Sequence, residues 1–502
     1  MSSFTWLDGS IVGLYLLGTM FAGLAVRRYV GRVDHFLLAG REVDVHLGIA
    51  SLAATEFGIV TCMYTAQNGF QYGFAGAVPG ILQAVAMLIV GLTGFGVGPL
   101  REAGVTTLPE LFDRRFGPRV RRAAGLVIVL GGLLNMGVFL RTGGEFLLLV
   151  TGAGAGADGA PVTWAQAHLL EIAMSALLLL VAVYTVLGGM LSVLVTDFLQ
   201  FIVMSAGLIV VTVLILHEVG WSTLVDAVAT HRGAGGFNPL ANPAMGWPYL
   251  LFNACLQLAA VLTWQTAVQR VLAARDTRTG RRIYTGTSFF FAARFLIPGI
   301  WGIAALAVLG PQIDTLHAMP RFLATFVPVG LMGLLVAAML AADMSTDSSY
   351  MLTWAGVIWN DILAPLHRGL WSEQRGLRWN RAIVAAIGLF LLFYGLWYPL
   401  KGDLWTYLGV TGTIYLASMS TLLVSCCYWR GANSAGAAAA IVTGAVIPVA
   451  YLVLEQLPAT SAFARGTIGP YWSGLAAYAG AALAMFVGSK LGGRRAAGGS
   501  PA

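Results

Sequence analysis

Five ionisable side chains lie inside long apolar stretches of the sequence, where a charge is costly. They are Glu56, Asp197, Arg294, Asp343 and Asp347. Such a residue costs about 2.5–3.5 kcal/mol at the centre of a membrane-spanning helix, so each one is a candidate for function. Four acids face one base, and an excess of buried negative charge requires protonation or a bound cation.

Some of these charges also have a structural interpretation. Asp343 and Asp347 are compatible with a water-exposed helix face in a vestibule, and Arg294 with an ion pair to one of the acids. Arg141 and Glu145 stand four residues apart, so we expect them to pair along one helix.

Hydroxyl side chains gather in the stretch AADMSTDSS, residues 341–349. Helical spacing places Ala342, Ser345, Thr346 and Ser349 on one face, with Ser348 at its edge. Hard cations prefer hydroxyl and carbonyl oxygens, and the stretch holds no His or Cys for a softer metal. The same spacing is typical of small-residue packing between membrane helices, so the pattern alone leaves both interpretations open.

The apolar segment 46–72 contains polar and glycine residues that interrupt its apolar character. The interruptions are Thr55, Glu56 and Gly58, then Gln67, Asn68 and Gly69. An interrupted helix exposes backbone carbonyls that can coordinate Na⁺ where they line a cavity. The segment is therefore predicted to be a broken helix beside a cation site.

The composition indicates the environment of these residues. Of 502 residues, 58% are hydrophobic and 10% charged, whereas soluble proteins have about 25% charged residues. This excludes an ordinary soluble enzyme and predicts a polytopic membrane protein, as does the mean hydropathy of +0.79. The four cysteines lack metal-ligand spacing, so we expect neither a zinc site nor a disulfide framework.

Thirteen apolar segments are long enough to cross a bilayer. They lie near residues 8–28, 46–72, 78–100, 121–149, 163–187, 190–217, 246–273, 283–309, 325–365, 380–400, 403–428, 434–456 and 470–490. The ninth is too long for one crossing, so we expect a surface turn near Pro328 and a cytosolic extension toward Asp361. The fold class is all-α with about thirteen transmembrane helices.

The basic residues predict the orientation. Twenty-three of the 29 Lys and Arg residues, Arg270 among them, fall on one side when these segments alternate across the membrane. Because basic loops stay in the cytoplasm, we expect a multi-pass protein of the cell (inner) membrane, with its N-terminus outside and its C-terminus inside.

Four strings in order along the chain resemble one family. They are FLLAGREV (36–43), YTVLGGMLSVLVTDFLQ (184–200), WQTAVQRVLAARD (264–276) and AADMSTDSSYMLTWAGVIWND (341–361). They closely resemble the sodium:solute symporter family, and the likeness runs from about residue 8 to 430. It implies a LeuT-type fold, in which two inverted five-helix repeats surround a site at the midplane.

The resemblance also implies a domain organisation. We expect an extracellular N-terminus, first transmembrane helix and basic cytoplasmic loop (1–45), a first repeat (46–220), a second repeat (221–430), two further transmembrane helices (431–490) and a flexible cytoplasmic tail (491–502).

Sodium ligands follow from the same resemblance, position by position. One site would use the carbonyls of Ala54, Phe57 and Ala342 and the hydroxyls of Ser345 and Thr346. A second site, present in some members, would correspond to Ser345, Ser348, Ser349 and Asp197. Asp343 and Asp347 stand where members usually carry apolar or small residues, which leaves the stoichiometry open.

The family's midplane pocket implies six substrate-binding candidates, and three further residues form a candidate coupling or charge network. The pocket candidates are Glu56, Thr61, Gln67, Gln257, Trp264 and Tyr407, and the network is Asp343, Asp347 and Arg294. Gln257 falls where sugar-transporting relatives place an amide. Their acidic and amide residues on the second segment are replaced by Val60 and Thr61, which disfavours a sugar.

We therefore expect a transporter and not an enzyme: Na⁺-coupled symport of a small polar organic solute, such as a carboxylate or amino acid. Na⁺ is the coupling ion, and a GxxxxGK[ST] nucleotide motif is absent. One alternative is a proton-coupled carrier using Glu56, Asp343 and Asp347. Another is a solute sensor with a separate signalling partner. The expected partners are the solute and membrane lipid, without nucleic acid; one copy of the chain suffices, and oligomers remain open.

Overall fold

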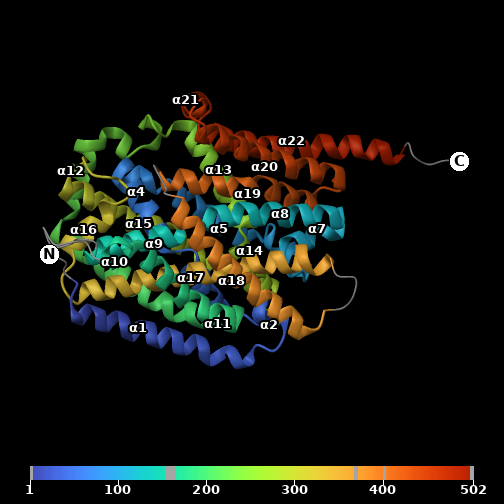
Figure 1. Ribbon diagram of the computed structural model, residues 1–502. Coiled ribbons are helices and arrows are strands. Elements are labelled where there is room, and N and C mark those ends of the chain that lie inside the picture. Colours follow the sequence, from blue (N-terminus) through green and yellow to red (C-terminus); the bar gives the residue numbers. More distant parts are fainter. Residues whose placement is uncertain (1–3, 154–163, 367–370, 399–402, 498–502) are drawn as a thin grey trace.

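Long apolar helices lie side by side through most of the chain. The computed structural model describes residues 4–153, 164–366, 371–398 and 403–497. Within these ranges the chain is helical, and its one isolated β-bridge joins Val43 to Ala274. Figure 1 shows α1 (Trp6–Ala25) on one face of the bundle, with α20 (Ser434–Gln456) and α22 (Pro470–Ala497) on the opposite face. The all-α fold class is confirmed.

The other helices are α2 (Val33–Leu38), α3 (Val45–Thr55), α4 (Ile59–Tyr72), α5 (Val78–Thr93), α6 (Val97–Glu102), α7 (Leu108–Phe116), α8 (Pro118–Met136), α9 (Phe139–Thr151), α10 (Trp164–Ala167), α11 (Leu169–Glu218), α12 (Trp221–Arg232), α13 (Gly246–Thr263), α14 (Gln265–Ala273), α15 (Thr277–Leu309), α16 (Ala318–Phe326), α17 (Leu331–Val357), α18 (Glu373–Trp397), α19 (Leu404–Tyr428) and α21 (Ser461–Phe463).

Eleven helical stretches of the described chain are long and apolar enough to cross a membrane. Two of them each contain two predicted segments. In Ile59–Thr93, a short 3₁₀ turn that begins at Gly73 (φ 60°) separates α4 from α5. The 50 residues of α11 would extend about 75 Å as one straight helix, but Gly189 (φ 53°) breaks it in the middle. A count of thirteen crossings stays a prediction.

The predicted turn near Pro328 is confirmed, because the chain is non-helical between α16 and α17. Asp8 of α1 holds the start of α17 in place. Its carboxylate accepts the N–H groups of Gly330 and Gly333, both at 2.7 Å, and so satisfies donors that a helix start leaves unpaired. At the other end of the chain, α22 continues to Ala497, and the rest of the expected tail lies outside the described residues.

The interruption predicted in segment 46–72 is confirmed at its first position and wrong at its second. Helix α3 ends at Thr55 and α4 begins after Gly58. Helix α4 then continues through Gln67, Asn68 and Gly69 without a break. Gly69 serves packing instead, because a Cβ there would lie 2.1 Å from the carbonyl oxygen of Gly299 on α15.

A second broken helix was not predicted. Trp264 leaves the helical conformation (φ −65°, ψ 119°) and separates α13 from α14. The sequence around it contains neither Gly nor Pro, so the usual signal for a break is absent. The two breaks fall in the first helix of each repeat that the resemblance predicts, and broken helices of this kind can present backbone groups to a ligand.

A polar cluster away from the breaks ties α9 to the chain before α16. The predicted pair of Arg141 and Glu145 is confirmed at 2.8 Å. Glu145 also lies 3.3 Å from His317 Nε2, and Asp314 lies 2.7 Å from His317 Nδ1. Both ring nitrogens therefore face carboxylates, which favours the protonated imidazole.

We expect His317→Gln to lower the unfolding midpoint by roughly 1 to 3 °C at pH 5.5 and to have little effect at pH 9. The hydrogen bond to Glu145 and the charge of Asp314 raise the pKa of His317. A raised pKa gives stability that is complete below the unfolded value of about 6.5 and is lost as the pH rises through the folded value. His231→Gln on α12, at an exposed position, is the control for thermal unfolding at both pH values. An equal effect of His317→Gln at the two pH values would contradict the ion pairing.

Candidate sodium and substrate sites

The break between α3 and α4 lies directly against the hydroxyl face of α17. Thr346 Oγ1 donates a hydrogen bond of 2.9 Å to the carbonyl of Thr55. A Cβ at Gly58 would lie 2.8 Å from the same hydroxyl oxygen, so the close approach of the two helices requires a glycine there. The predicted first site draws its five oxygens from the two elements that meet at this contact. Hydroxyl and carbonyl oxygens suit Na⁺.

We expect Gly58→Ala to raise the Na⁺ concentration for half-maximal solute uptake about tenfold. The added methyl group would push α17 away from the break, and overpacking of this kind costs about 1–3 kcal/mol, where about 1.4 kcal/mol corresponds to tenfold. The measurement is uptake into proteoliposomes as a function of Na⁺ concentration.

Gly18→Ala in α1 is the matched control, because a Cβ at Gly18 meets nothing within 4 Å. An unchanged Na⁺ dependence in Gly58→Ala would show that the contact between Gly58 and Thr346 has no part in sodium binding.

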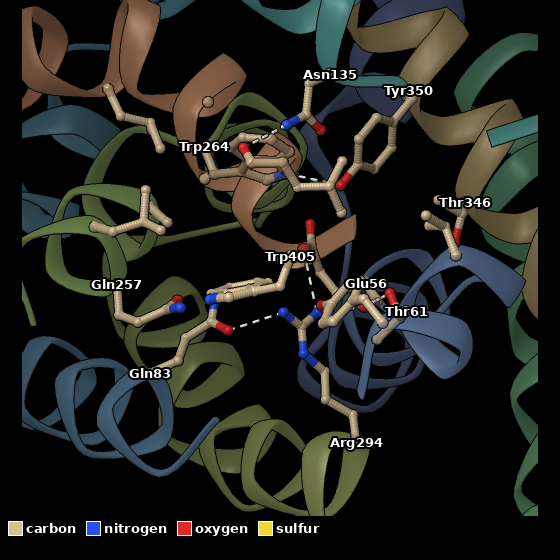
Figure 2. Close-up of a pocket in the computed structure, with 18 of the residues that line it drawn as sticks. Glu56, Thr61, Gln83, Asn135, Gln257, Trp264, Arg294, Thr346, Tyr350 and Trp405 are labelled. Carbon is tan, nitrogen blue, oxygen red and sulfur yellow. Dashed lines mark hydrogen bonds and ion pairs between the residues drawn. The ribbon is translucent and has the colours of Figure 1, made fainter. Parts of the chain in front are cut away.

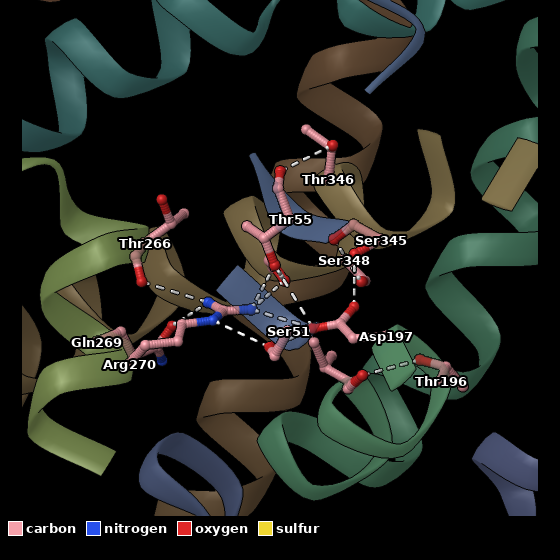
Figure 3. A network of polar contacts seen from close by, with 12 residues as sticks. Ser51, Thr55, Thr196, Asp197, Thr266, Gln269, Arg270, Ser345, Thr346 and Ser348 are labelled. Atoms are coloured by element: carbon pink, nitrogen blue, oxygen red, sulfur yellow. Dashed lines mark hydrogen bonds and ion pairs between the residues drawn. The ribbon is translucent and has the colours of Figure 1, made fainter. Parts of the chain in front are cut away.

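A fully buried arginine lies beside this contact (Figure 3). Arg270 donates from Nη2 to Thr55 Oγ1 (2.6 Å) and to Ser349 Oγ (2.5 Å), and from Nε to Ser51 Oγ (3.2 Å). It is therefore not a solvent-exposed basic residue of the kind that predicts orientation. It lies in α14, which the break at Trp264 separates from α13 and which packs against α3 and α17. For a single Arg near the end of an apolar segment, the sequence does not show whether the side chain lies in a loop or is buried in the core.

Asp197 of α11 pairs with this arginine at 3.3 Å. Its carboxylate also accepts hydrogen bonds from Ser51 Oγ (2.5 Å) and Ser345 Oγ (2.6 Å). Ser348 Oγ donates to the Ser345 carbonyl (3.1 Å). The structure thus brings together the residues predicted for a second sodium site. Asp197 already pairs with Arg270, so a bound cation would have to share the carboxylate with the arginine.

Asp343 and Asp347 are each 1% exposed, so the water-filled vestibule suggested for them is wrong. Both carboxylate oxygens of Asp347 and Oδ2 of Asp343 are buried without a hydrogen-bond partner. The backbone N–H of Ile59 interacts with the Asp343 carboxylate. Asp197 and Glu56 each have an arginine partner, whereas Asp343 and Asp347 have none in the described chain.

A cavity of about 80 Å³ opens beside the same break (Figure 2). It is lined by Thr55, Glu56, Val60, Thr61, Tyr64, Gln83, Asn135, Phe139, Leu256, Gln257, Ala260, Trp264, Arg294, Thr346, Tyr350, Trp405, Leu408, Gly409, Gly412 and Leu416. Four of the six predicted substrate residues are therefore among the lining residues: Glu56, Thr61, Gln257 and Trp264.

The other two predicted substrate residues lie elsewhere. Gln67 Oε1 accepts the N–H of Leu404 at 3.1 Å, and its Nε2 donates to Thr315 at 3.0 Å. Tyr407 donates to the Leu134 carbonyl at 2.7 Å. Both therefore tie helices together outside the cavity lining.

Arg294 forms the polar centre of the cavity with Glu56, as Figure 2 shows. Their side chains form the expected ion pair, with Nη1 at 3.5 Å from Oε2. Arg294 also donates to the Glu56 carbonyl and, at 2.8 Å, to Gln83 Oε1. The rings of Phe291 (4.4 Å) and Phe295 (5.4 Å) lie against its guanidinium, and cation–π attraction is strong at a desolvated site.

Two amide side chains of the lining, Gln83 of α5 and Asn135 of α8, were not predicted. Asn135 Nδ2 donates to the Leu408 carbonyl at 2.9 Å and so ties α8 to α19. Both are lone amides inside apolar segments. Amides in such positions are expected to hydrogen-bond between helices, and this signal could have found them.

Most of the chain matches one protein family. The model of the sodium:solute symporter family matches residues 36–444. Sodium/glucose cotransporter 4 of Danio rerio is 23% identical, over 92% of this chain and 74% of the relative. The sodium/myo-inositol cotransporter of Mus musculus is 25% identical, over 89% of this chain and 67% of the relative.

Among solved structures, a Na⁺-coupled sialic acid symporter in a substrate-bound outward-open state has the same fold. Its TM-score is 0.77 at 19% identity, covering 97% of this chain and 98% of that one. The architecture is therefore of the LeuT type, as expected. The chain belongs to the sodium:solute symporter family and is a Na⁺-coupled solute transporter, not an enzyme.

Proposed function

We propose that this chain carries Na⁺ and a small polar organic solute, a carboxylate or amino acid, together into the cell. The observation that carries the proposal is the position of Thr346. This residue contacts the break at Thr55 and Gly58 and also lines the cavity beside Glu56. A sodium ion held there would touch both the broken helix and the wall of the solute site.

Coupling follows from that position. A ligand shifts a conformational equilibrium only by its differential affinity for the two states. A sodium ion that bridges the α3–α4 break and α17 favours the state in which these elements meet and the cavity is formed. The solute then permits closure. One Na⁺ moving down 100 mV supplies about 2.3 kcal/mol, which corresponds to a solute gradient of more than tenfold.

We assign the sodium ligands as the carbonyls of Ala54, Phe57 and Ala342 and the hydroxyls of Ser345 and Thr346. Ser348, Ser349 and Asp197 are proposed for a second ion, in competition with Arg270. Glu56, Thr61, Gln257 and Trp264 are proposed to contact the solute. We also propose that the N-terminus lies outside the cell and the C-terminus in the cytoplasm.

Uptake of labelled lactate, alanine and glucose into proteoliposomes tests the function. It is compared in Na⁺ and choline buffers between pH 5.5 and 8. Accumulation of lactate or alanine that depends on Na⁺ is the expected result. Accumulation that depends on pH alone would establish the proton-coupled alternative through Glu56, Asp343 and Asp347. Solute binding without uptake would establish a sensor, and uptake of glucose alone would overturn the solute class.

A further inference from the structure

A groove of about 540 Å³ runs between α13, α19 and α22, three helices that pack against one another. Each of these helices belongs to a stretch that is long and apolar enough to cross a membrane. Leu258 and Val424 line the groove and remain exposed, so its open side faces lipid. The groove shares no lining residue with the solute cavity, and no Asp or Glu is among the described residues that line it.

Aromatic rings mark one end of the groove. Phe95 stacks on Tyr428 with 4.8 Å between the ring centroids, and Trp429 stacks on Phe486 with 5.9 Å. Phe95, Trp429 and Phe486 belong to the lining. They lie where α5 and α19 end, and aromatic side chains gather at the level of the lipid headgroups. The groove therefore extends from the headgroup level into the hydrocarbon layer.

Two basic side chains stand at this aromatic end. Lys490 Nζ lies 5.7 Å from the centroid of the Phe486 ring, and Arg430 directly follows Trp429 in the chain. Both side chains are exposed, and neither has a carboxylate partner among the residues that the structure describes. Arg115, by contrast, donates to the Trp429 carbonyl and is held at the end of α19. Lys490 and Arg430 thus remain available to an anion.

We propose that this groove binds an anionic phospholipid. Its acyl chain lies against Leu258, Leu262 and Met485, and its phosphate lies at Lys490 and Arg430. The apolar walls suit the chain, and the two cations at the headgroup level complement the phosphate. Basic pockets between membrane helices on the cytoplasmic side bind anionic headgroups, and we assign this end of the bundle to the cytoplasm.

The lipid would contact a helix that also borders the solute cavity. Leu258 and Leu262 of α13 line the groove, whereas Gln257 and Ala260 of the same helix line the cavity. At 100° per residue these two pairs lie on opposite faces of α13. A lipid in the groove therefore supports the cavity wall from behind.

Native mass spectrometry of the full chain, purified in detergent and freed of copurified lipid, tests the proposal. The probes are dioleoyl-phosphatidylglycerol, dioleoyl-phosphatidylcholine with the same chains, and glycerol 3-phosphate without chains. We expect the anionic lipid to bind at least about tenfold more tightly than the zwitterionic one, and glycerol 3-phosphate not to bind. Equal binding of the two lipids would overturn the proposal, as would binding of glycerol 3-phosphate as tight as that of the lipid. A dimer that phosphatidylglycerol does not dissociate would identify a second copy of the chain as the occupant.

Substitutions at the headgroup end locate the phosphate. Lys490→Gln and Arg430→Gln should each weaken the binding of phosphatidylglycerol about fivefold, and the double variant about 25-fold. Binding of phosphatidylcholine should change little. Arg378→Gln, at an exposed position on α18, is the control for the general charge of the surface. An equal effect of Arg378→Gln, or unaltered binding in the double variant, would overturn the headgroup assignment.

A substitution that fills the groove locates the acyl chain. Ala482 lines the groove and is exposed, so Ala482→Phe should block the first bound phosphatidylglycerol without disturbing the core. Ala479→Phe is the matched control, because Ala479 is exposed on the same helix but is not among the lining residues. If Ala482→Phe binds phosphatidylglycerol as the wild type does, the lipid lies elsewhere and the proposal is wrong.

Discussion

Ser345→Ala combined with Thr346→Ala is expected to abolish Na⁺-stimulated solute uptake while the protein still inserts into the membrane. The two hydroxyls are the side-chain oxygens proposed for the first sodium site, and Thr346 also holds the carbonyl of Thr55 at 2.9 Å. Without them, α17 keeps only the Ala342 carbonyl among the ligands proposed for this site, so the ion loses both side-chain oxygens that join α17 to the break in the helix. Uptake into proteoliposomes in Na⁺ and choline buffers measures the effect.

The chain offers a matched control in Ser420→Ala/Thr421→Ala on α19. These neighbouring hydroxyls donate to helix carbonyls of Leu416 (2.7 Å) and Ala417 (2.9 Å), away from the break. The single variants distinguish the loss of a sodium ligand from the loss of the hydrogen bond to Asp197, because Ser345 donates to Asp197 and Thr346 does not. A double variant that keeps the sodium dependence of the wild type would refute the site.

The fold could largely be predicted from the sequence, because length and apolarity are strong signals for membrane helices. The break at Gly58 was also predictable, since polar residues and a glycine interrupt an apolar run there. Asn68 and Gly69 give the same signal but lie in a continuous helix. What distinguishes them is the close contact of Gly69 with Gly299 on a distant helix, which local sequence does not contain.

The candidate site was predictable only in part, for a related reason. Residue types identified Glu56 and Arg294 as costly charges, and the structure pairs them. Arg270 is equally buried, yet it lies in the string WQTAVQRVLAARD, close to the basic residues that follow it. Its role depends on the unpredicted break at Trp264 and on Asp197 of another helix. Pairings between distant helices set the polar network, and one sequence does not specify them.

Arg270→Gln is expected to destabilise the protein by about 3–5 kcal/mol, because it leaves a fully buried Asp197 without a positive partner. Little folded protein should survive extraction in detergent. Asp197→Asn/Arg270→Gln removes both charges and should recover most of the stability, since replacing a buried pair by neutral groups costs much less than breaking it. Thermal unfolding of the two variants and of Asp197→Asn measures the coupling.

The control for this pair is Arg275→Gln, only five residues away in the sequence. Its ion pair with Asp276, at 3.8 Å, lies on side chains that are 61% and 56% exposed, and pairs of that kind contribute about 0–1 kcal/mol. If the double variant recovers stability, the main role of Arg270 is to compensate the charge of Asp197, and packing alone does not explain its contribution. An equal loss of stability in Arg270→Gln and in the double variant would show the opposite, namely that the arginine contributes through its contacts with Ser51, Thr55 and Ser349.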